Sequence, residues 1–400
     1  MNICFLSQEY PPETHVGGIG TYTFNVASAL AKLGHTVHVI TSTRNTERTF
    51  QNNGVSVHKI KRRKIKLQEL EHLVYSYRVA KKISWIECQF DIVQASEYAN
   101  EAFWFSFDKK VPLITRLATP FFLVEKMNGK MFLGPRPFFN WMEKKQTLSS
   151  DGIFTSTTAI AKAVTEKWRI ELEKVNIIPN SVDISRIIRL GANKSVPDIL
   201  KNNRFLLYFG RLEERKGVRD IAQALPAVFK QFPELNVVFV GNDLGYKGSS
   251  MRDYIRKESG SFNNRVIFFD NLPHDELFPI VNSAKMVILP SVWEAFGFVC
   301  VEAMALGRPV IATSGSGFQE IIENNVSGFL VEPRNNKMLA NKIIESLKDE
   351  GNLLRISEGA RKRAKDFEVS AVSNQLLAYY DKVIKDWKIK KKHRVGCNKR

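Results

Sequence analysis

Residues 2–41 read NICFLSQEYPPETHVGGIGTYTFNVASALAKLGHTVHVIT, and this stretch decides the fold. It opens with an apolar, β-rich run at 2–7, followed by a loop that contains Gly17-Gly18-Ile19-Gly20. Apolar residues then recur at helical spacing up to Gly34, a typical helix stop, and 36–41 is a second apolar strand. Strand, glycine loop, helix and strand in this order predict a βαβ unit of a parallel sheet.

The same alternation of strand and helix patterns continues along the chain and begins again in its second half. Short apolar runs recur between helical segments, and a new strand begins at Phe205 after the polar stretch 181–203. The chain is therefore predicted to be α/β, with two Rossmann-like doubly wound domains that face each other across a cleft. The predicted strands are 92–94, 113–115, 152–155 and 175–178 in the first half, and 205–209, 237–240, 266–269, 287–289 and 310–312 in the second.

The length of 400 residues agrees with two domains. We place the first domain at 1–183 and the second at 184–368. A final helix is predicted at 369–387, where apolar residues at helical spacing let it cross back to the first domain, and a basic tail follows at 388–400.

The formal net charge is +18 at pH 7, and it is concentrated in a few segments. Such an excess favours an anionic membrane surface, phosphorylated substrates or nucleic acid as partners. Nucleic acid is disfavoured, because the sequence contains no recognised nucleic-acid module. Basic residues among aromatic ones suit a membrane headgroup layer, and a solvated charge-rich surface is the alternative. The segments are 59–66, the tail from Lys388, and Lys126, Lys130, Arg136, Lys144 and Lys145 with Phe132, Phe138, Phe139 and Trp141.

Cysteine usage and hydropathy point to a compartment. The four cysteines are scattered, with no C-x-x-C pair, which argues against a zinc site or a disulfide framework and fits a reducing compartment. No apolar stretch approaches the roughly 18 residues of a membrane span, and the apolar run at the start is too short for a signal sequence. We therefore expect a cytoplasmic protein, peripheral at the inner face of the membrane, with no metal and no cofactor.

Functional motifs are expected just after strands, because ligands of such folds bind outside the carboxyl ends of the strands. Gly17 and Gly18 follow the first strand and precede a helix, whose first N–H groups can hold an anion. The loop is not a G-x-G-x-x-G sequence, so a simple tight turn is the alternative.

A second motif follows the strand at 205–209. Gly210-Arg211 and Lys216-Gly217 place an arginine and a lysine five positions apart. A planar guanidinium and a mobile ammonium can converge on a diphosphate from the end of a strand. Two exposed surface cations are the alternative.

A third motif, PSVWEAFGFVCVE at 290–302, lies between a strand and a helix. Glu294 is on the loop, and Glu302 is about one turn inside the helix. A carboxylate such as Glu302 suits a ribose diol, because it accepts from both hydroxyls. Two capping or surface glutamates are the alternative. The backbone N–H groups that can bind a phosphate or a sugar at the helix start belong to Phe296, Gly297 and Phe298.

Taken in order, these motifs resemble the family-4 retaining glycosyltransferases of the GT-B fold, also called glycosyltransferase group 1. The resemblance covers nearly the whole chain. Asn180-Ser181-Val182-Asp183 is similar to the family's N-G-V-D hinge, with Ser in place of Gly. The other matching strings are Pro11-Pro12 with Gly17-Gly18-Ile19-Gly20, Gly210-Arg211 with Lys216-Gly217, and EAFGFVCVE at 294–302 followed by AMALGRPVIAT.

The resemblance implies transfer of a hexose from a UDP- or GDP-linked sugar to a glycan or lipid-linked acceptor, in polysaccharide biosynthesis at the cytoplasmic membrane face. The first domain would bind the acceptor and the second the donor. Arg211, Lys216 and Glu294 would be catalytic, the two cations stabilising charge on the leaving nucleotide without a metal. Donor contacts would come from Arg211 and Lys216 (diphosphate), Glu302 (ribose), Glu294 with the amides of Phe296, Gly297 and Phe298 (sugar), Gly17 and Gly18 (diphosphate), and the backbone near Asn271 and Leu272 (base).

One position departs from the family pattern. The family often has R-L-H-T-P after the strand at 113–115, and here Ala118 stands in place of the histidine that helps position the donor sugar. Because the cationic residues are retained, a changed donor preference is favoured over an inactive enzyme. The alternatives are a GT-B relative such as a nucleotide-sugar epimerase, or a nucleotide-sugar-binding protein with an altered donor site.

Overall fold

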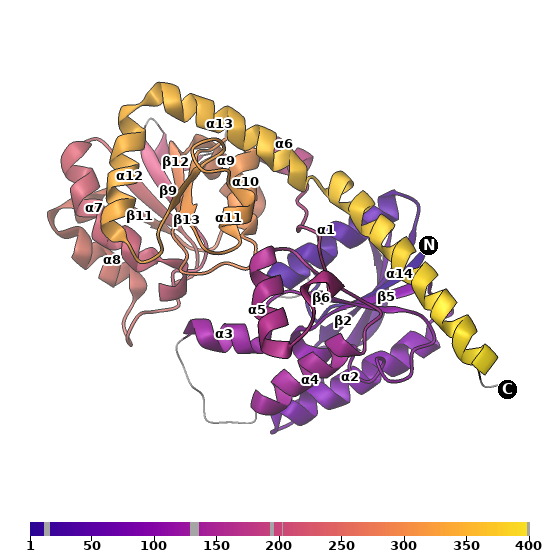
Figure 1. Cartoon of the computed structure of the whole chain (residues 1–400). Helices are drawn as coiled ribbons and strands as arrows, with labels where there is room; N and C mark the ends of the chain where they lie inside the picture. The colour runs from indigo at the N-terminus through magenta and orange to yellow at the C-terminus, as the bar shows by residue number, and fades with distance from the viewer. Residues whose placement is uncertain (12–16, 129–135, 193–195, 202, 398–400) are drawn as a thin grey trace. The chain divides into compact units, whose positions relative to one another are not determined.

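The computed structural model describes residues 1–11, 17–128, 136–192, 196–201 and 203–397 (Figure 1). The chain forms two compact units, Met1–Ser181 with Val369–Arg400, and Val182–Glu368. The division lies two positions from the boundary that the sequence predicts, and the final helix belongs to the first unit. Pro12, Lys130 and Phe132, which the sequence analysis singled out, lie outside the described residues.

The first unit is built on an eight-stranded sheet. Its strands are β1 (Asn2–Leu6), β2 (Thr36–Thr43), β3 (Arg48–Asn52), β4 (Val55–Lys61), β5 (Ile92–Ser96), β6 (Leu113–Leu117), β7 (Gly152–Thr155) and β8 (Val175–Ile177). They lie in the order β3-β4-β2-β1-β5-β6-β7-β8, and only the β3–β4 pair is antiparallel. The helices are α1 (Gly18–Lys32), α2 (Gln68–Trp85), α3 (Phe121–Asn128), α4 (Arg136–Leu148), α5 (Thr158–Trp168) and α14 (Val369–Cys397).

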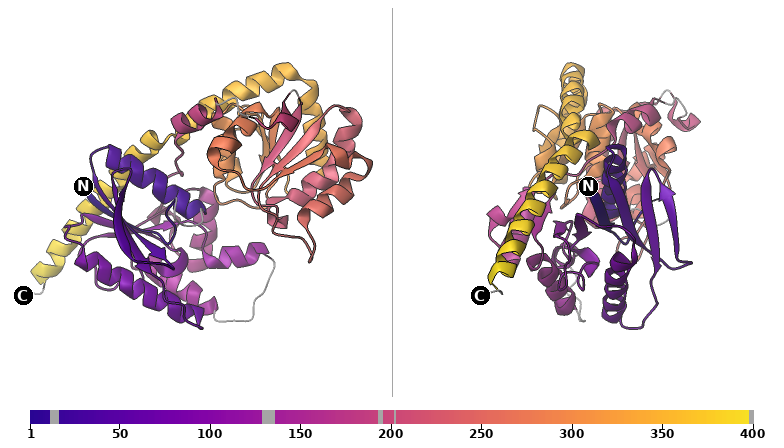
Figure 2. Two further views of the ribbon diagram at one scale, coloured as in Figure 1. Left: turned by 180° about the vertical axis from the view of Figure 1, so that it is seen from behind. Right: turned by 90° about the vertical axis from the view of Figure 1, so that its right-hand side faces the viewer.

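Helices cover both faces of this sheet (Figure 2). The core on one face combines Tyr75 and Val79 of α2 with side chains of β1, β2 and β5. On the other face α14 packs beside α1, and the Tyr380 hydroxyl donates a hydrogen bond of 2.5 Å to Gln94 of β5. Because the sheet is covered on both faces, the side chains of β5 and β6 are buried along the whole length of these strands, including polar ones such as Gln94 and Arg116.

The second unit holds a six-stranded parallel sheet. Its strands are β9 (Phe205–Phe209), β10 (Asn236–Val240), β11 (Val266–Phe269), β12 (Met286–Leu289), β13 (Val310–Thr313) and β14 (Phe329–Val331), in the order β11-β10-β9-β12-β13-β14. The helices are α6 (Ile184–Gly191), α7 (Val218–Gln231), α8 (Met251–Ser259), α9 (His274–Ser283), α10 (Phe298–Ala305), α11 (Phe318–Ile321), α12 (Asn336–Lys348) and α13 (Glu350–Ala364).

Side chains of β9 alternate between two cores of the second unit. Leu206 and Tyr208 pack with α7, α8 and α12, whereas Phe205, Leu207 and Phe209 pack with α6, α9 and α10. Successive side chains of a strand point to opposite faces, so the apolar run at 205–209 supplies both cores.

The strand order creates one topological switch point in each sheet. β1 has β2 on one side and β5 on the other, and β9 lies in the same way between β10 and β12. Doubly wound folds bind ligands at the carboxyl ends of the strands around such a point. The segments that follow β1, β5, β9 and β12 are therefore the candidate positions for a site.

Two parts of the first unit differ from the sequence-based prediction. The hairpin of β3 and β4 was not predicted, although its turn, Asn53-Gly54, has φ values of 50° and 78° and carries the Asn-Gly signal of a type I′ turn. The predicted end of the last helix at 387 and the tail from 388 were wrong, because α14 continues to Cys397. Lysine is a good helix former, so a basic run free of proline continues the helix. Within the described ranges, no helix combines the length and the hydropathy needed to cross a membrane.

Candidate functional site

Two loops at the switch point of the second unit bring Lys216 and Glu294 together. Lys216 ends a short 3-10 turn after β9, and Glu294 lies on the loop after β12. Nζ of Lys216 lies 2.5 Å from Oε2 of Glu294, and the two side chains are only 17% and 15% exposed. Because β9 and β12 are adjacent and parallel, their following loops share one edge of the sheet. The fold thus joins two predicted site residues that are 78 positions apart.

Backbone contacts fix the positions of these two loops. Gly217 has a φ of +69°, and a Cβ atom on it would lie 1.8 Å from the carbonyl oxygen of Pro290. Only glycine fits such a close approach without moving one of the loops. The N–H of Val292 also donates to the carbonyl of Arg215 at 2.9 Å. The loop after β9 is therefore held against the loop after β12, which sets Lys216 opposite Glu294.

Arg211 lies on the same edge and is more exposed. Its side chain is 54% exposed, and its Nη2 lies 3.2 Å from Oε1 of Glu213. The hydroxyl of Tyr208 donates to the carbonyl of Arg211 at 2.7 Å. Arg211 is therefore a solvent-accessible cation on a fixed backbone.

Charges around Glu294 keep it ionised. Burial acts to raise the pKa of the Glu294 carboxyl, but Lys216, Arg215 and Arg211 outweigh it and hold the pKa below its ordinary value. Arg215 and Arg211 also pair with Glu213 at 2.9 and 3.2 Å. Three cations therefore meet two carboxylates, and the site keeps a positive excess that suits a diphosphate.

The start of α10 forms the third side of the site. Gly297 precedes the helix with a φ of +102°, and a Cβ atom there would lie 2.3 Å from the ring of Phe318. The first N–H groups of a helix have no acceptor inside it, so the amide of Phe298 can serve a ligand. The side chain of Phe296 is buried and packs edge-on against Phe298 and Phe367, which leaves only its backbone for binding.

Glu302 lies inside α10 and is nearly buried. Burial raises the pKa of its carboxyl to about 7, although Arg186 of α6 acts in the opposite direction. Its protonation therefore changes near neutral pH. As a carboxylate it can accept hydrogen bonds from two neighbouring hydroxyls.

Asn271 and Leu272 follow β11 on the same edge of the sheet. Asn271 is exposed, whereas Leu272 packs partly against the core beneath α9 and α10. Strand β10 separates β11 from β9, so the two segments start about 10 Å apart, as two strand spacings require. A ligand that touches both segments must span that distance, which a nucleotide does.

In the first unit, Gly17 and Gly18 lie at the start of α1, after β1. The N–H of Gly17 donates to Oε2 of Glu9 at 2.9 Å, and a Cβ atom on Gly17 would lie 2.6 Å from the same oxygen. Gly18 is exposed as the first residue of the helix. Of the two predicted glycines, Gly17 therefore has an acceptor inside the unit, and Gly18 presents the accessible backbone.

Ala118, in the position of the family histidine, follows β6 and is buried. Its N–H donates to both carboxyl oxygens of Glu97, at 2.9 and 2.8 Å. Arg116 of the same string lies with its guanidinium 3.9 Å from the ring centroid of Tyr22 and donates to Asn180 at 2.8 Å. The backbone of this segment is thus fixed by buried polar partners without an imidazole.

Three buried acids near the carboxyl ends of β5 and β6 were not predicted from the sequence. Burial raises the pKa of Glu97, Glu101 and Glu143 above the ordinary range of a carboxyl. Glu97 and Glu101 follow the strand predicted at 92–94, so the rule that singled out Glu294 applies to them as well. Glu143 is on α4 and accepts from the N–H of Phe121 at 2.9 Å, a contact that no sequence signal indicates.

Two family models match the chain, and together they span most of it. The model described as Glycosyltransferase Family 4 matches residues 16–186, and the model described as Glycosyl transferases group 1 matches residues 192–363. An uncharacterized glycosyltransferase of Methanocaldococcus jannaschii is 24% identical over 378 residues, which cover 90% of this chain and 93% of that protein.

Solved structures share the fold. Sucrose-phosphate synthase from Thermosynechococcus elongatus superposes with a TM-score of 0.78 at 20% identity, covering 96% of this chain and 99% of that chain. Anabaena HepE in complex with UDP-glucose superposes with a TM-score of 0.70 at 20% identity, covering 96% and 100%. At this identity the likeness establishes the two-domain α/β architecture.

Proposed function

Because this chain belongs to the group 1 and family 4 glycosyltransferases, with the GT-B fold, we propose that it is a retaining hexosyltransferase. The donor is a UDP- or GDP-linked hexose, and the acceptor is a glycan or a lipid-linked sugar at the cytoplasmic membrane face. The observation that carries the proposal is the Lys216–Glu294 pair at the switch point of the second sheet. Anabaena HepE, which has the same fold, is described with UDP-glucose, and this supports a nucleotide-sugar donor.

The proposed chemistry is electrostatic. The bond between the anomeric carbon and the diphosphate breaks, its electron pair stays on the nucleotide, and the acceptor hydroxyl bonds to the sugar while its proton passes to the diphosphate. Arg211 and Lys216 stabilise the negative charge that grows on the diphosphate. Glu294 and the amide of Phe298 orient the sugar, and Glu302 holds the ribose. Cations in these positions do the work that a metal does elsewhere, so we expect turnover to survive a chelator.

An exposed aromatic surface on the first unit supports action at a membrane. Trp104 and Phe107 follow β5, Trp141 lies on α4, and all three are at least 42% exposed. The ring of Phe103 contacts each of them at centroid distances of 5.0 to 5.8 Å, so the patch is continuous. Phe138 stacks on Trp141, whereas Phe139, which the sequence analysis placed with it, is buried. Amphipathic rings of this kind favour the headgroup layer.

Flotation with vesicles of phosphatidylglycerol and phosphatidylcholine tests the membrane part of the proposal. Replacing Trp104 and Trp141 by Ser is expected to reduce the bound fraction several-fold. Trp85, 73% exposed at the end of α2, is the matched control, and Trp85→Ser should float as the wild type does. Equal flotation of all variants would remove the membrane face from the proposal.

Turnover is tested with UDP- and GDP-linked hexoses. A thermal-shift panel first identifies the nucleotide, because a ligand that binds only the folded state raises the midpoint. Release of that nucleotide is then followed with and without glycan and lipid-linked acceptors, and the anomeric configuration of the product is read by NMR. An inverted product would overturn retention alone, whereas no release with any donor would overturn the transferase.

Ala118 favours a second candidate, a nucleotide-sugar-binding protein with an altered donor site. The two candidates differ in one measurement. A binding protein raises its unfolding midpoint with a nucleotide sugar but releases no nucleotide under any condition, whereas the transferase releases it when an acceptor is added. An epimerase, the remaining alternative, would convert the donor to a new sugar without an acceptor.

A further inference from the structure

The ends of β2 and β4 place a group of cations around a hollow in the first unit. β2 and β4 pair in parallel with Thr43 opposite Lys61, so the next residues, Arg44 and Arg62, lie side by side. The N–H of Arg62 donates to the carbonyl of Thr43 at 2.8 Å, which extends the ladder by one step. The hollow, here called the cationic pocket, has a volume of about 550 Å³ and is lined by Arg44, Lys61, Arg62, Arg63 and Lys64.

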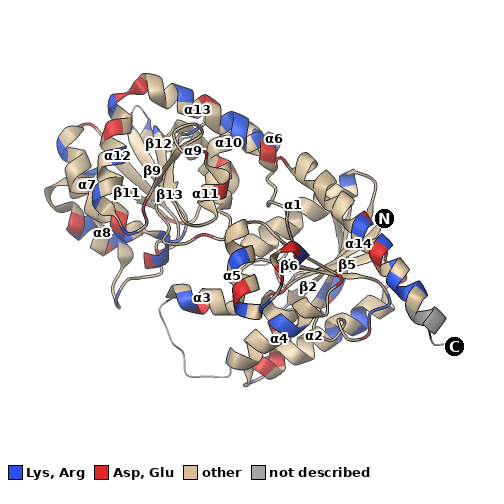
Figure 3. Ribbon diagram, in the orientation of Figure 1, with Lys and Arg blue, Asp and Glu red and all other residues tan. Residues whose placement is uncertain are grey.

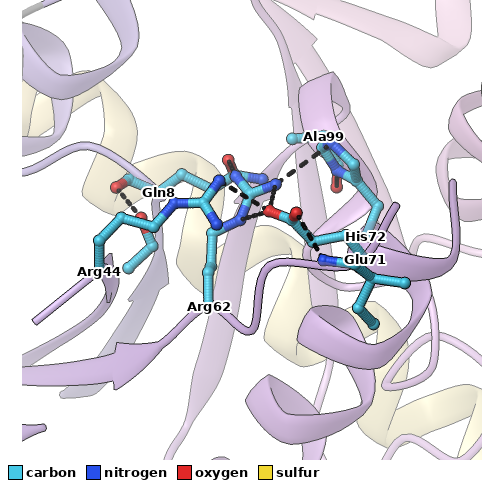
Figure 4. A network of polar contacts seen from close by, with 8 residues as sticks. Gln8, Arg44, Arg62, Glu71, His72 and Ala99 are labelled. Carbon is cyan, nitrogen blue, oxygen red and sulfur yellow. Dashed lines mark hydrogen bonds and ion pairs between the residues drawn. The ribbon is translucent and has the colours of Figure 1, made fainter. Parts of the chain in front are cut away.

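Arg62 is held in place by partners on three sides (Figure 4). Its Nη2 lies 2.8 Å from Oε1 of Glu71, and its Nη1 donates to Oε1 of Gln8 at 2.5 Å. Its guanidinium carbon lies 5.5 Å from the ring centroid of Tyr75, and the side chain is only 13% exposed. The guanidinium is thus oriented before any ligand arrives, which lowers the entropy that binding must overcome.

The acid beside Arg62 does not neutralise the cationic pocket. Glu71 also contacts Arg44 at 2.9 Å, so one carboxylate serves two arginines. Burial acts to raise the pKa of Glu71, but Arg62 and Arg44 outweigh it and lower the pKa, which keeps this single negative charge. His72 adds none: burial and Arg62 lower its pKa, and its Nδ1 lies 3.2 Å from the carbonyl oxygen of Ala99.

The side chains of the remaining lining residues are not paired with any acidic side chain that the structure describes. Lys61, Arg63 and Lys64 are exposed, and no carboxylate of the described chain forms an ion pair with any of them. The nearby Glu47 pairs instead with Arg78 and accepts the backbone N–H of Lys61 at 2.9 Å. Five cations therefore face one paired carboxylate. A structural ion pair explains Arg62 and Glu71 but leaves the three exposed cations unexplained.

The cationic pocket lies at the functional edge of its sheet. Gln8, which holds Arg62, follows β1 at the switch point, and its own N–H donates to buried Glu101. The next residue, Glu9, accepts from the N–H of Gly17 at the start of α1. One short segment therefore connects the pocket to the glycine loop of the first unit.

We propose that the cationic pocket binds a phosphate or diphosphate group carried by the acceptor. The oriented fork of Arg62 with Arg44 suits two phosphate oxygens, and the mobile ends of Lys61, Arg63 and Lys64 neutralise the remaining charge. Acceptors that bear such a group are sugar phosphates and lipid-linked diphosphates. This inference rests on the proposed function, because it assigns the acceptor class of that reaction.

Direct titration of the full chain tests the pocket with glucose 6-phosphate as probe and glucose as its uncharged match. The nucleotide identified by thermal shift is present in excess, so that the donor site is filled. The test variant carries Arg63→Gln and Lys64→Gln, at two exposed positions that form no ion pair within the described ranges, and it leaves the buried Arg62–Glu71 pair intact. The control carries Lys382→Gln and Lys385→Gln on exposed turns of α14, where Lys and Arg are also frequent (Figure 3).

The test variant is expected to bind glucose 6-phosphate at least about tenfold more weakly, since each lost charged contact changes affinity by about that factor. The control should bind as the wild type does, and added salt should weaken wild-type binding more than that of the test variant. Vesicles of phosphatidylglycerol and phosphatidylcholine form the second arm. If the wild type binds vesicles but not glucose 6-phosphate, and the test variant loses vesicle binding, the result would support a lipid as the source of the phosphate group. Unchanged affinity in both arms would overturn the proposal.

A kinetic arm separates this proposal from the proposed function. The test variant should release nucleotide from the donor without acceptor at the wild-type rate, and its KM for a phosphorylated acceptor should rise with little change in kcat. If the wild type shows no nucleotide release at all, the transferase fails while the titration still decides the pocket. If KM for a phosphorylated acceptor is unchanged, the pocket is not the acceptor site.

Discussion

Lys216 and Glu294 carry opposite charges 2.5 Å apart, on loops that follow neighbouring strands. The charge of Lys216 offsets the burial of Glu294 and, with Arg215 and Arg211, holds the pKa of that carboxyl below its ordinary value. A lysine held in this way presents its ammonium where a diphosphate would enter. At the scale of single residues, the site is thus an arrangement of charges whose positions the backbone sets.

Replacing Lys216 by Met should reduce kcat/KM by about 10²–10³, the usual cost of removing one group that stabilises transition-state charge. Nucleotide release with saturating acceptor is the measurement. Lys230→Met, at an exposed position in the last turn of α7, is the control and should keep wild-type activity. A loss of less than threefold in Lys216→Met would argue against its role at the diphosphate.

Donor affinity should depend on pH through Glu302. Its folded pKa of about 7 exceeds the ordinary 4.5, so the folded state holds the proton more tightly than the unfolded chain does. The stability from this group is full below pH 4.5 and is lost as pH rises to about 7. The carboxylate that binds a ribose diol forms over the same range. Donor KM should therefore fall as pH rises through about 7, whereas Glu302→Gln should give a flat profile.

The matched control for Glu302 is Glu358→Gln, an exposed position on α13, which should keep the wild-type pH profile of donor KM. Urea unfolding supplies an independent readout. Glu302→Gln should be more stable than the wild type at pH 8, where the wild type buries a charge, and the same profile in both proteins would contradict the assignment.

At the scale of elements, a turn of defined geometry joins β9 to α7 at the switch point of the second sheet. Gly217 lies between β9 and α7 with its Cα against Pro290, and it has the left-handed backbone that glycine tolerates. This turn sets the direction of the side chain of the neighbouring Lys216. The strands of the sheet thus position the charged side chains of the site through one or two residues with a left-handed backbone.

Gly217→Ala should cost about 3 kcal/mol or more of unfolding free energy, because left-handed strain adds to a clash with backbone. Gly248→Ala separates the two effects. Gly248 has a similar φ of +83° with nothing near its Cβ position, so about 1–2 kcal/mol is expected. Urea denaturation of both variants measures the difference, and equal costs would show that the contact with Pro290 does not matter.

Strands β2 and β4 should make the first unit sensitive to acid. Nδ1 of His38 lies 2.9 Å from Nε2 of His58, and their rings stack. Burial, with the nearby His38 and Lys82, lowers the pKa of His58 to about 4, below the ordinary 6.5. The unfolded state then binds more protons, so unfolding free energy falls as pH decreases from 6.5 to about 4.

Replacing His58 by Gln should flatten this acid loss, which urea midpoints measured across the same pH range would show. His393→Gln, on the exposed end of α14, should leave the profile unchanged. If His58→Gln loses stability with acid as steeply as the wild type, other groups carry the effect.

At the scale of the whole molecule, the chain passes between two units that each have their own sheet and cores. It leaves the first unit after Ser181 and returns at Val369. The N–H of Val182 donates to the carbonyl of Phe367 at 2.9 Å, so the two passages start from one point of the second unit. α14 completes the first unit although it follows the second in sequence.

Tyr380→Ala should therefore destabilise the first unit alone. Tyr380 is fully buried, and removing its ring and its hydrogen bond to Gln94 should cost about 3–5 kcal/mol. In calorimetry the midpoint temperature of the first unit should decrease. The midpoint of the other transition, which bound nucleotide raises, should not change. Lys382→Ala, two positions further along α14 and exposed, is the control. A single transition whose midpoint changes both with Tyr380→Ala and with added nucleotide would show that the two units unfold together.

The sequence by itself determined the class of fold and the residues of the candidate site in the second unit. Apolar strands, glycine turns and helical spacing are local patterns, and motifs that directly follow strands lie at the ligand-binding edge by the geometry of parallel sheets. Arg211, Lys216 and Glu294 were therefore predictable from their positions in the chain. Residues 388–397 were misassigned because a basic run is read equally well as a tail or as a helix.

Only the tertiary structure decided which distant residues meet and which are buried. The opposition of Lys216 and Glu294 depends on the order of β9 and β12 in the sheet, which a single sequence does not encode locally. The pKa of Glu302 depends on its burial in the packed unit. The cationic pocket arises because the register of β2 and β4 sets Arg44 beside Arg62. The number and positions of the basic residues are read from the sequence, but only the pairing of distant strands brings them together in one site.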